Sequence, residues 1–295
     1  MEINSDFPSE VSGTKGWLAT RCAEFLNLLR MIRLRCPVKI IAIQALQLLI
    51  YTLIYPIPRV VLGRRKIQNF LTSFSEILKP IIVPFPPPLK SKVITCWFSS
   101  FGLFSEIYLE DIYSKETLKK GQNIIDVGAN IGVYTILAAE KVSNSGRVIA
   151  IEPEPKNYEL LIKNIELNNF QNVIPKNIAL TGHEGFEKLY LSSSFAGHSL
   201  VFQENKNSYI NIPVTTIDKL VEELGFKKID IIKIDAEGAE MPILKGAEKT
   251  LKANPDIKLM VACYHYPFQV EEVCQFLTKR SFKTKVSSKN VVMTV

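Results

Sequence analysis

The 295-residue sequence is poor in the residues that build zinc sites and disulfide frameworks, with five cysteines and three histidines. No C-x-x-C pair occurs, and the histidines are not spaced as zinc ligands. Scattered free thiols are typical of proteins in a reducing cytosol. Residues 1–16 are polar and lack the basic-then-apolar start of a signal peptide, which argues against secretion. These absences predict a cytoplasmic protein without structural zinc or disulfides.

Excess positive charge is missing from most of the chain, although the net charge is +7. Residues 1–90 contain 12 Lys and Arg against 5 Asp and Glu, whereas residues 91–295 contain 24 of each kind. A neutral domain lacks the basic surface that follows nucleic-acid phosphates. Nucleic acid is therefore not expected as a partner.

The basic N-terminal part also contains an uncharged apolar run, residues 40–58. At about 19 residues it is long enough to cross a bilayer, but two glutamines and two late prolines make it a weak spanning helix. Basic residues flank it on both sides, so the positive-inside rule gives no orientation. The pattern fits better a helix or re-entrant hairpin held on an anionic membrane surface through residues 17–66. The alternative is a helical extension that packs on the catalytic domain or forms a dimer, and the oligomeric state is left open.

Proline is concentrated in residues 79–90, which read KPIIVPFPPPLK. Proline cannot continue a helix or a central strand, so this stretch is interpreted as a semi-rigid linker. It divides the chain into a mainly helical, apolar and basic extension, residues 1–90, and a catalytic domain, residues 91–295.

A strand, a glycine turn, a helix and a second strand are predicted at the start of the catalytic domain. Residues 124–127 and 148–151 are apolar runs typical of strands buried on both faces, and residues 133–141 suit a helix. The first strand and the helix are joined by Gly128-Ala129-Asn130-Ile131-Gly132. Glycine lets the backbone turn sharply and approach a ligand, and asparagine tolerates a left-handed conformation. This order is the first half of a nucleotide-binding α/β domain.

The glycine turn lacks the G-x-G-x-x-G spacing that binds the pyrophosphate of hydride cofactors. Asp126, just before the turn, would repel a pyrophosphate but suits the α-amino group of S-adenosylmethionine. Glu152, after the second strand, can accept hydrogen bonds from both ribose hydroxyls. Asn177 lies in the third predicted strand, residues 173–179, where its amide either pairs with the adenine or caps a turn. The predicted cofactor residues are Asp126, Gly128, Ala129, Asn130, Gly132, Glu152 and Asn177. An NAD-dependent enzyme is the alternative function, which the glycine spacing disfavours.

Two further predicted strands, residues 229–234 and 257–263, bring polar residues to the carboxyl edge of the sheet, where ligands bind in open α/β folds. Asp235 and Glu237 follow the first of them and orient the cofactor amine, bind an acceptor hydroxyl or accept its proton. His265 follows the second and is either a proton acceptor or a loop hydrogen-bonding residue. The two carboxylates supply too few ligands for a divalent metal, so none is predicted.

Three segments resemble the FkbM-type family of S-adenosylmethionine-dependent methyltransferases: IDVGANIGVYTILAAE, IEPEPKNYELLIKNIELNN and IDIIKIDAEGAEMPILKGAEKTL. The resemblance covers roughly Ser105 to His265, and its most specific part is the block Asp235–Glu240. It implies an α/β class I methyltransferase (Rossmann-like) fold with a seven-stranded sheet. It also implies transfer to a hydroxyl oxygen, often of a sugar or a secondary metabolite. Asn130 replaces the middle glycine of many class I enzymes, as is expected in this family.

Two segments of the catalytic domain are expected to border the acceptor. In relatives the lead-in before the first strand covers the cofactor or contributes to the acceptor site. Its candidates here are Glu106, Tyr108 and Tyr113, with packing at the edge as the alternative. Residues 185–215 are expected to form an antiparallel excursion, with Phe195, Gly197, His198 and Ser199 on its loop. The predicted function is O-methylation of a sugar, glycan, lipid-linked or secondary-metabolite acceptor. The alternative is a catalytically inactive methyltransferase-fold adaptor at a membrane.

Overall fold

A computed structural model describes the catalytic part of the chain and short pieces of its N-terminal part. The described residues are 25–29, 31–33, 41–42, 45, 81–95, 101–192, 197–203 and 207–295. Among them, no helix combines the length and the apolar character needed to cross a bilayer. Most of the segment 17–66, on which membrane contact is predicted, lies outside the described residues.

The centre of the molecule is a mixed seven-stranded sheet in the order β11-β12-β10-β9-β3-β4-β5. The strands from β10 to β5 run parallel, and β12 pairs antiparallel with both β10 and β11. The strands are β3 (Asn123–Val127), β4 (Arg147–Ile151), β5 (Val173–Lys176), β9 (Ile231–Ile234), β10 (Lys258–Ala262), β11 (Thr284–Val286) and β12 (Val291–Thr294). This arrangement confirms the α/β class and the seven-stranded sheet predicted from the sequence.

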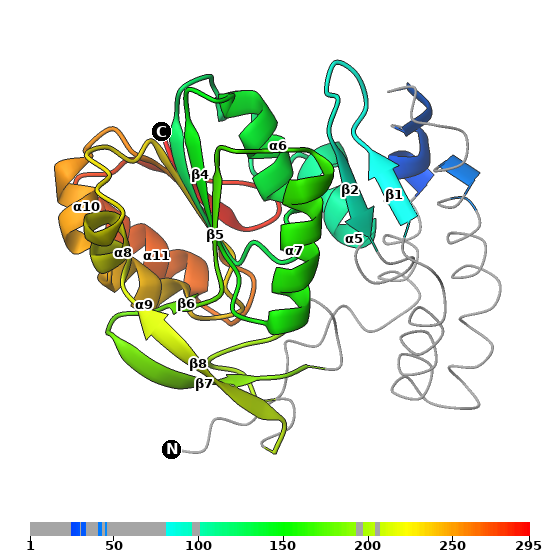
Figure 1. The fold of residues 1–295 in the computed structure, drawn as a ribbon. Helices are drawn as coiled ribbons and strands as arrows, with labels where there is room; N and C mark the ends of the chain where they lie inside the picture. Colours follow the sequence, from blue (N-terminus) through cyan, green and yellow to red (C-terminus); the bar gives the residue numbers. More distant parts are fainter. Residues whose placement is uncertain are drawn as a thin grey trace.

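Helices cover both faces of the sheet, because its central strands are apolar on both sides (Figure 1). One layer contains α6 (Val133–Val142) and α7 (Pro155–Leu167). The other contains α8 (Ile217–Glu223), α9 (Glu240–Lys245), α10 (Glu248–Ala253) and α11 (Gln269–Thr278). Neighbouring residues of β3 belong to different cores: Ile124 packs with the first layer and Ile125 with the second.

A smaller sheet in the order β6-β8-β7 forms the predicted excursion after the third strand. Its strands are β6 (Ala179–Leu180), β7 (Gly185–Tyr190) and β8 (Tyr209–Thr215). The third predicted strand, 173–179, is therefore two strands in different sheets. The chain leaves the main sheet at Asn177, whose Nδ2 donates to the carbonyl oxygens of Glu152 (2.9 Å) and Pro153 (3.0 Å).

The proline-rich stretch is part of a hairpin, which corrects its interpretation as a semi-rigid linker. β1 (Ile81–Pro84) pairs antiparallel with β2 (Lys92–Thr95), and the hairpin lies beside α7. The side-chain amide of Asn164 in α7 bonds the backbone of Ile94, and that of Asn168 bonds the backbone of Lys92. Prolines are tolerated because this small sheet needs no further strand.

Short pieces of the N-terminal part contact the core beside this hairpin. Met31 is fully buried in the cluster that contains Phe85 and Phe104, and Asn27 Nδ2 donates to Glu110 Oε1 at 2.8 Å. At these residues the chain packs on the catalytic domain, which is one of the arrangements that the sequence left open. The division at residue 90 into extension and catalytic domain stays a prediction.

Candidate active site

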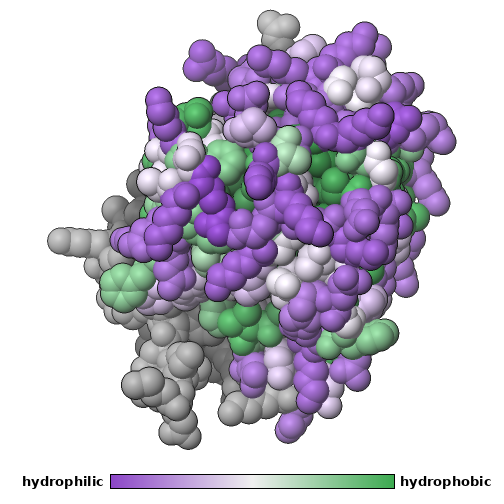
Figure 2. Space-filling view, turned by 90° about the vertical axis from the view of Figure 1, so that its left-hand side faces the viewer, coloured by the Kyte–Doolittle hydropathy of each residue, from purple (hydrophilic) through white to green (hydrophobic). Residues whose placement is uncertain are grey.

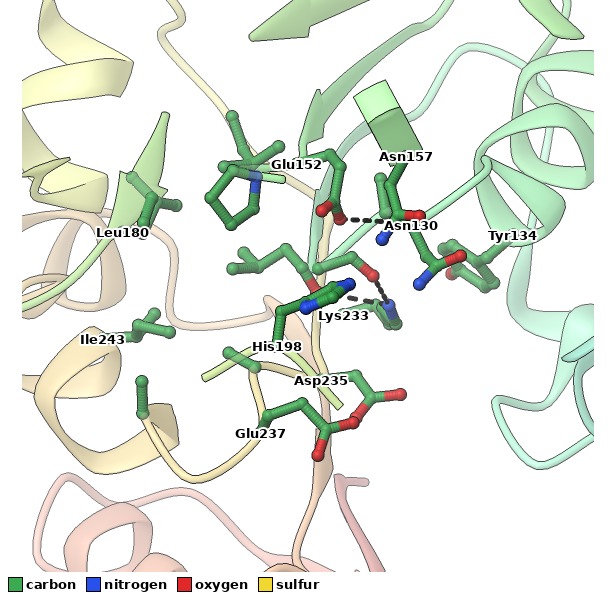
Figure 3. A pocket seen from close by; sticks show the side chains of 18 of the residues that line it. Asn130, Tyr134, Glu152, Asn157, Leu180, His198, Lys233, Asp235, Glu237 and Ile243 are labelled. Atoms are coloured by element: carbon green, nitrogen blue, oxygen red, sulfur yellow. Dashed lines mark hydrogen bonds between the residues drawn. The ribbon is translucent and has the colours of Figure 1, made fainter. Parts of the chain in front are cut away.

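The carboxyl ends of β3, β4 and β9 border a pocket of about 870 Å³, counted out into its open mouth. Its polar side carries the 128–131 turn, Glu152 and Asp235, while Ile151, Leu180 and Ile243 belong to its apolar side (Figure 3). This is the edge of an open α/β sheet at which ligands bind.

The glycine turn after β3 has the left-handed conformations that its sequence predicts. Gly128 has φ 71°, Asn130 φ 51° and Gly132 φ 89°. A Cβ on Gly128 would lie 1.8 Å from the carbonyl oxygen of Asp235, and one on Gly132 would lie 2.6 Å from Leu161 Cδ1. The glycines are therefore required because the turn passes close to the rest of the protein, and not only to a ligand.

Glu152 occupies the predicted position at the end of β4, with its carboxylate at the pocket. Oε2 accepts a hydrogen bond from the backbone N–H of Asn130 at 2.8 Å, and Oε1 accepts one from that of Glu154 at 3.0 Å. Burial raises the pKa of Glu152 to about 7, although these hydrogen bonds act in the opposite direction. The group is thus a hydrogen-bonding acid that titrates close to neutral pH.

Asp126 is not among the residues that line the pocket, which corrects the expectation that its carboxylate faces a cofactor amine. Its side chain is fully buried beneath the turn, where Oδ2 accepts a hydrogen bond from Thr135 Oγ1 at 2.6 Å. Oδ1 lies 3.1 Å from Lys233 Nζ, which also donates to the carbonyl oxygen of Gly128 at 2.7 Å. Asp126 and Lys233 are partners in the register of β3 and β9. The pair holds the turn in place.

Asn177 also lies outside the pocket lining, because its amide caps the loop after β4 as described above. This is the turn-capping alternative. Asn157, in the first turn of α7, lines the pocket instead, and its side chain hydrogen-bonds Glu152. Asn157 was not predicted from the sequence, in which its only signal is its position shortly after Glu152.

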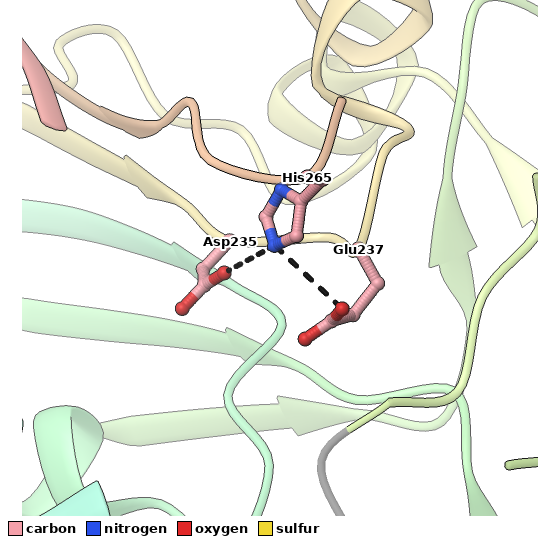
Figure 4. A group of neighbouring side chains, drawn as sticks. All are labelled: Asp235, Glu237 and His265. Carbon is pink, nitrogen blue, oxygen red and sulfur yellow. Dashed lines mark ion pairs between the residues drawn. The ribbon is translucent and has the colours of Figure 1, made fainter. Parts of the chain in front are cut away.

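The structure brings Asp235, Glu237 and His265 together at the mouth of the pocket (Figure 4). His265 Nε2 lies 3.5 Å from Asp235 Oδ1 and 3.6 Å from Glu237 Oε2. Asp235 Oδ2 also accepts a hydrogen bond from the hydroxyl of Tyr113 at 2.7 Å. The hydroxyl of Tyr264 lies 3.2 Å from Asp235 Oδ1. Asp235 and Glu237 line the pocket, so their carboxylates can receive a ligand there.

The charges in this cluster change what His265 can do. Burial alone would lower the pKa of His265, but the nearby carboxylates of Asp235 and Glu240 outweigh it and raise the pKa to about 10. An imidazole with this pKa is protonated at neutral pH and cannot accept a proton from a hydroxyl. Burial raises the pKa of Glu237 to about 7, with Asp235 and Glu240 adding to the shift against His265. In this arrangement Glu237 is better suited than His265 to accept a proton.

Glu240 supports the cluster from beneath. Its side chain is fully buried, and Oε1 accepts hydrogen bonds from the backbone N–H groups of Ala236 at 2.8 Å and Gly238 at 3.3 Å. Oε1 also lies 3.2 Å from Nδ1 of His265. The burial shows that this acid shapes the turn that carries Glu237.

The lead-in before β3 contributes one of its three candidates to the cluster. Tyr113 is the residue that reaches Asp235, whereas Tyr108 packs against Phe85 and Phe104 in the core. Glu106 is exposed. For Tyr108 the packing alternative is therefore confirmed.

The loop between β7 and β8 borders the pocket on another side. His198 lines the pocket, and Ser199 Oγ donates to the carbonyl oxygen of Glu237 at 2.6 Å. Gly197 is partly exposed beside them, and Phe195 lies outside the described residues. The excursion thus fixes the turn that carries Glu237.

Comparison with known proteins agrees with the resemblance found in the sequence. The family model of the methyltransferase FkbM domain matches residues 126–284, which is more than half of the chain. The chain belongs to the FkbM methyltransferase domain family. The matched range includes the end of β3, the parallel strands β4, β5, β9 and β10, the glycine turn and the Asp235–Glu240 block.

Several curated proteins are similar to this FkbM-domain chain. Methyltransferase 1 of Beauveria bassiana is 25% identical over 166 residues, covering 50% of this chain and 66% of the relative. Methyltransferase sdnD of Sordaria araneosa is 24% identical over 178 residues, covering 50% and 68%. Hexuronic acid methyltransferase AglP of Haloferax volcanii is 26% identical over 165 residues, covering 56% and 65%. The chain thus spans about two thirds of the length of these relatives.

A solved structure of the methyltransferase FkbM from Methylobacillus flagellatus KT is also similar. It has 17% sequence identity and a TM-score of 0.44 to this FkbM-domain chain, covering 59% of it and 44% of the solved chain.

Proposed function

We propose that the protein is an S-adenosylmethionine-dependent O-methyltransferase that acts on a hydroxyl group of a sugar-like or other polyhydroxylated acceptor. One observation carries the proposal: Glu152, which suits a ribose, and the cluster of Asp235 and Glu237, which suits a hydroxyl, line the same pocket. A methyl donor and its acceptor must meet in such a pocket with their reacting atoms close together. Membership of the FkbM methyltransferase domain family supports the same reaction class.

The pocket residues fit the parts of this cofactor. The buried carboxylate of Glu152 can accept hydrogen bonds from a ribose diol, and Asn157 beside it adds a second polar group. Ile151, Leu180 and Ile243 offer an apolar surface for a flat base. His265, Lys233 and Tyr113 together outweigh burial and hold the pKa of Asp235 below its ordinary value, so this carboxylate is negative where a cationic ligand would lie.

The chain's own residues then have simple tasks. When bound, S-adenosylmethionine supplies a methyl group that is already activated by the sulfonium, so no covalent enzyme intermediate is needed. Asp235 and Glu237 bind the acceptor hydroxyl and turn its oxygen toward the donor. Glu237, with its pKa near 7, takes up the proton of the hydroxyl as the new O–C bond forms. His198 and Leu200, from the described part of the loop between β7 and β8, line one side of the pocket.

Three relatives' names agree with this class without fixing the acceptor. One of them is called a hexuronic acid methyltransferase, and that substrate is a property of the relative. We infer an acceptor with several hydroxyl groups because two carboxylates and the hydroxyls of Tyr113 and Tyr264 meet at the pocket mouth.

Calorimetry with S-adenosylmethionine tests the cofactor part of the proposal. The full chain should bind the cofactor, and Glu152→Ala should weaken binding by at least about 100-fold, because a charge-assisted pair of hydrogen bonds is lost. Glu159→Ala is the matched control, since Glu159 is an exposed acid on α7 outside the pocket. Binding of NAD in place of S-adenosylmethionine would overturn the proposal.

Product analysis tests the transfer. With a panel of sugars, uronic acids and polyols, mass spectrometry should find an acceptor that gains one methyl group on oxygen. Cofactor binding without methylation of any acceptor in such a panel would instead support the inactive adaptor.

A further inference from the structure

We propose that Asp235, Glu237 and His265 form a divalent-cation site at the mouth of the pocket. The sequence located the two carboxylates but not a third ligand, and the fold supplies it from the end of the neighbouring strand β10. One ligand atom from each of the three side chains lies within 4.8 Å of the others. The role that we give this cation in acceptor binding rests on the proposed function, whereas the binding of the metal does not.

The two distances from His265 to the carboxylates are longer than ordinary hydrogen bonds and close to the spacing of neighbouring ligands around a metal ion. His265 Nε2 lies 3.5 Å from Asp235 Oδ1 and 3.6 Å from Glu237 Oε2. Hydrogen bonds between nitrogen and oxygen are usually about 2.7–3.2 Å long. Neighbouring ligand atoms around a cation with bonds of about 2.1 Å lie roughly 3.0–3.5 Å apart. A cation between the three atoms therefore requires small movements and the release of the proton from Nε2 of His265, whose place the cation takes.

The histidine provides independent support for the site. Its side chain is 5% exposed, and within the described residues neither ring nitrogen makes a hydrogen bond of good geometry, although carboxylate oxygens lie 3.2–3.6 Å away. A buried polar atom without a hydrogen bond is costly, so it needs an explanation such as a missing ion. The Nε2 atom points between the two carboxylates in Figure 4. It is aimed at the position that the cation would occupy.

The surroundings hold the three ligands in place, as outer residues do at metal sites. Glu240 Oε1 lies 3.2 Å from Nδ1 of His265, on the side of the ring away from the site. Tyr113 donates to Asp235 Oδ2 at 2.7 Å. Glu237 has a left-handed backbone, φ 49°, in a turn held by Ser199. A non-glycine residue in this conformation is strained and is often found at a functional site.

The charge balance also favours a cation. Asp235, Glu237 and Glu240 surround a single histidine. The charge of Lys233 also acts on Asp235, but its Nζ is bound to Asp126 and to two backbone carbonyl oxygens and makes no ion pair with this group. Two carboxylates and one imidazole suit Mn²⁺, Mg²⁺ or Zn²⁺.

Three protein ligands leave coordination positions open toward the pocket, because Asp235 and Glu237 line it. An acceptor that carries a hydroxyl next to a second oxygen donor, such as a neighbouring hydroxyl or a carboxylate, can fill two of these positions. Binding to the cation lowers the pKa of the hydroxyl, and its proton passes to an unbound carboxylate oxygen or to solvent. Its oxygen then forms the new bond to the methyl carbon as the bond from that carbon to sulfur breaks, and the electron pair of that bond stays on sulfur. The inferred acceptor is therefore a vicinal diol or a hydroxy acid.

A manganese titration tests the site without any turnover. The full chain, stripped with EDTA, is titrated with MnCl₂ while the electron paramagnetic resonance signal of free Mn²⁺ is recorded. We expect one site per chain, and His265→Asn should weaken it at least tenfold. Circular dichroism of the variant checks that it folds. If the wild-type protein binds no Mn²⁺, Mg²⁺ or Zn²⁺ at millimolar concentration, the inference is wrong, whatever the variants do.

Two further variants make the result specific. His183→Asn removes an exposed histidine that lies 2.7 Å from Glu187, and it should leave Mn²⁺ binding unchanged. Loss of binding in that variant would mean that the measured ion sits on the surface. Glu152→Ala should lose S-adenosylmethionine but keep Mn²⁺, whereas His265→Asn should do the reverse. A protein that binds the metal but never the cofactor would refute the proposed function and leave the metal site standing.

Discussion

At the scale of single residues, Glu152 links the stability of the fold to pH. Its pKa is raised from 4.5 to about 7, mainly by burial. An acid with a raised pKa in the folded state stabilises the fold below its unfolded pKa. This contribution is lost as the pH rises through the folded pKa. The relevant window is therefore about pH 4.5 to 7, where the unfolded chain has released this proton and the folded chain still binds it.

We expect Glu152→Gln to remove this pH dependence. Between pH 5 and pH 8 the free energy of unfolding of the wild type should fall by roughly 2–3 kcal/mol relative to the variant. Urea denaturation of both proteins at the two pH values measures the difference. The matched control is Glu159→Gln, which replaces an exposed acid on α7. This variant should keep the pH dependence of the wild type. If the free energy of unfolding fell equally in both variants between pH 5 and pH 8, Glu152 would have an ordinary pKa.

Asp126 and Lys233 form a second buried residue pair, and the sequence carried a signal for it. Lys233 is the only charged residue in the otherwise apolar strand β9, and only 3% of its side chain is exposed. A lysine in a strand buried on both faces requires an acidic partner. We assigned Asp126 to a cofactor amine because the sequence places it next to the turn. The direction of the Asp126 side chain depends on the register of β3 and β9, which cannot be read from the sequence.

Removing one partner of this pair should destabilise the protein. We expect Asp126→Asn to lower the free energy of unfolding by about 3 kcal/mol, because Lys233 is left charged and buried. The double variant with Lys233→Met should lose less than the sum of the two single changes. Among molecules that remain folded, calorimetry should find S-adenosylmethionine affinity within about threefold of wild type. Loss of cofactor binding without loss of stability would restore Asp126 as a direct ligand.

At the scale of elements, the glycine turn shows how closely β3 and β9 approach at their carboxyl ends. A Cβ on Gly128 would lie 1.8 Å from the carbonyl oxygen of Asp235, which follows β9. The glycine turn and the end of β9 therefore restrict each other's position. Gly225, after α8, also has a positive φ, 69°, but has no atom within 4 Å of an added Cβ. Substitutions at these two glycines therefore distinguish the free-energy cost of the left-handed conformation from the cost of a steric clash.

We expect Gly225→Ala to cost about 1 kcal/mol, which is the penalty of the left-handed conformation alone. Gly128→Ala should cost at least about 3 kcal/mol and also weaken the Mn²⁺ site, because Asp235 must move. Denaturation with urea and the manganese titration measure the two effects. Equal costs for the two substitutions would show that the turn is not tightly held against β9.

The sheet and its helices could be predicted because their signals are local. Apolar runs, helical spacing and caps such as Thr216, which accepts from Lys219 N–H, are written in short segments. The hairpin of β1 and β2 was missed because its prolines argue against a strand. The partner that makes it stable, α7, lies about 70 residues further along. Asn164, fully buried on that helix, was the available sign that a backbone docks there.

The grouping at the site could be predicted from the strand order, whereas its chemistry could not. Parallel strands that end at one edge place Asp235 and Glu152 on either side of the end of β3, and β10 adds His265. The pKa of His265 depends on Glu240, which hydrogen-bonds the turn at Ala236 and Gly238 and thereby reaches the ring. Such a contact depends on side-chain packing and cannot be recognised from the spacing of residues in the sequence.

At the scale of the whole molecule, charge and apolar character are unevenly distributed. The face that carries α8 and α10 is largely hydrophilic, with apolar side chains in small patches (Figure 2). The positive excess lies within residues 1–90, next to the uncharged run 40–58. From this basic, apolar segment beside a neutral catalytic domain we propose that the protein contacts an anionic membrane surface.

We therefore expect the full chain to float with vesicles that contain phosphatidylserine, and much less with vesicles of phosphatidylcholine alone. Each basic residue near such a surface contributes about 1 kcal/mol. Replacing Arg64, Arg65 and Lys66 together by glutamate should reduce the bound fraction at least tenfold. Raising the salt to about 0.5 M should have a similar effect, since it shortens the screening length to a few ångströms.

The same experiment distinguishes membrane contact from packing on the catalytic domain, which Met31 and Asn27 already show for part of the segment. If the basic residues face a membrane, the triple substitution should leave the free energy of unfolding and the affinity for S-adenosylmethionine unchanged. If they support the domain, it should lower stability and leave vesicle binding as weak as in wild type. A chain that ignores anionic vesicles at low salt, with its extension intact, would exclude the membrane surface as a partner.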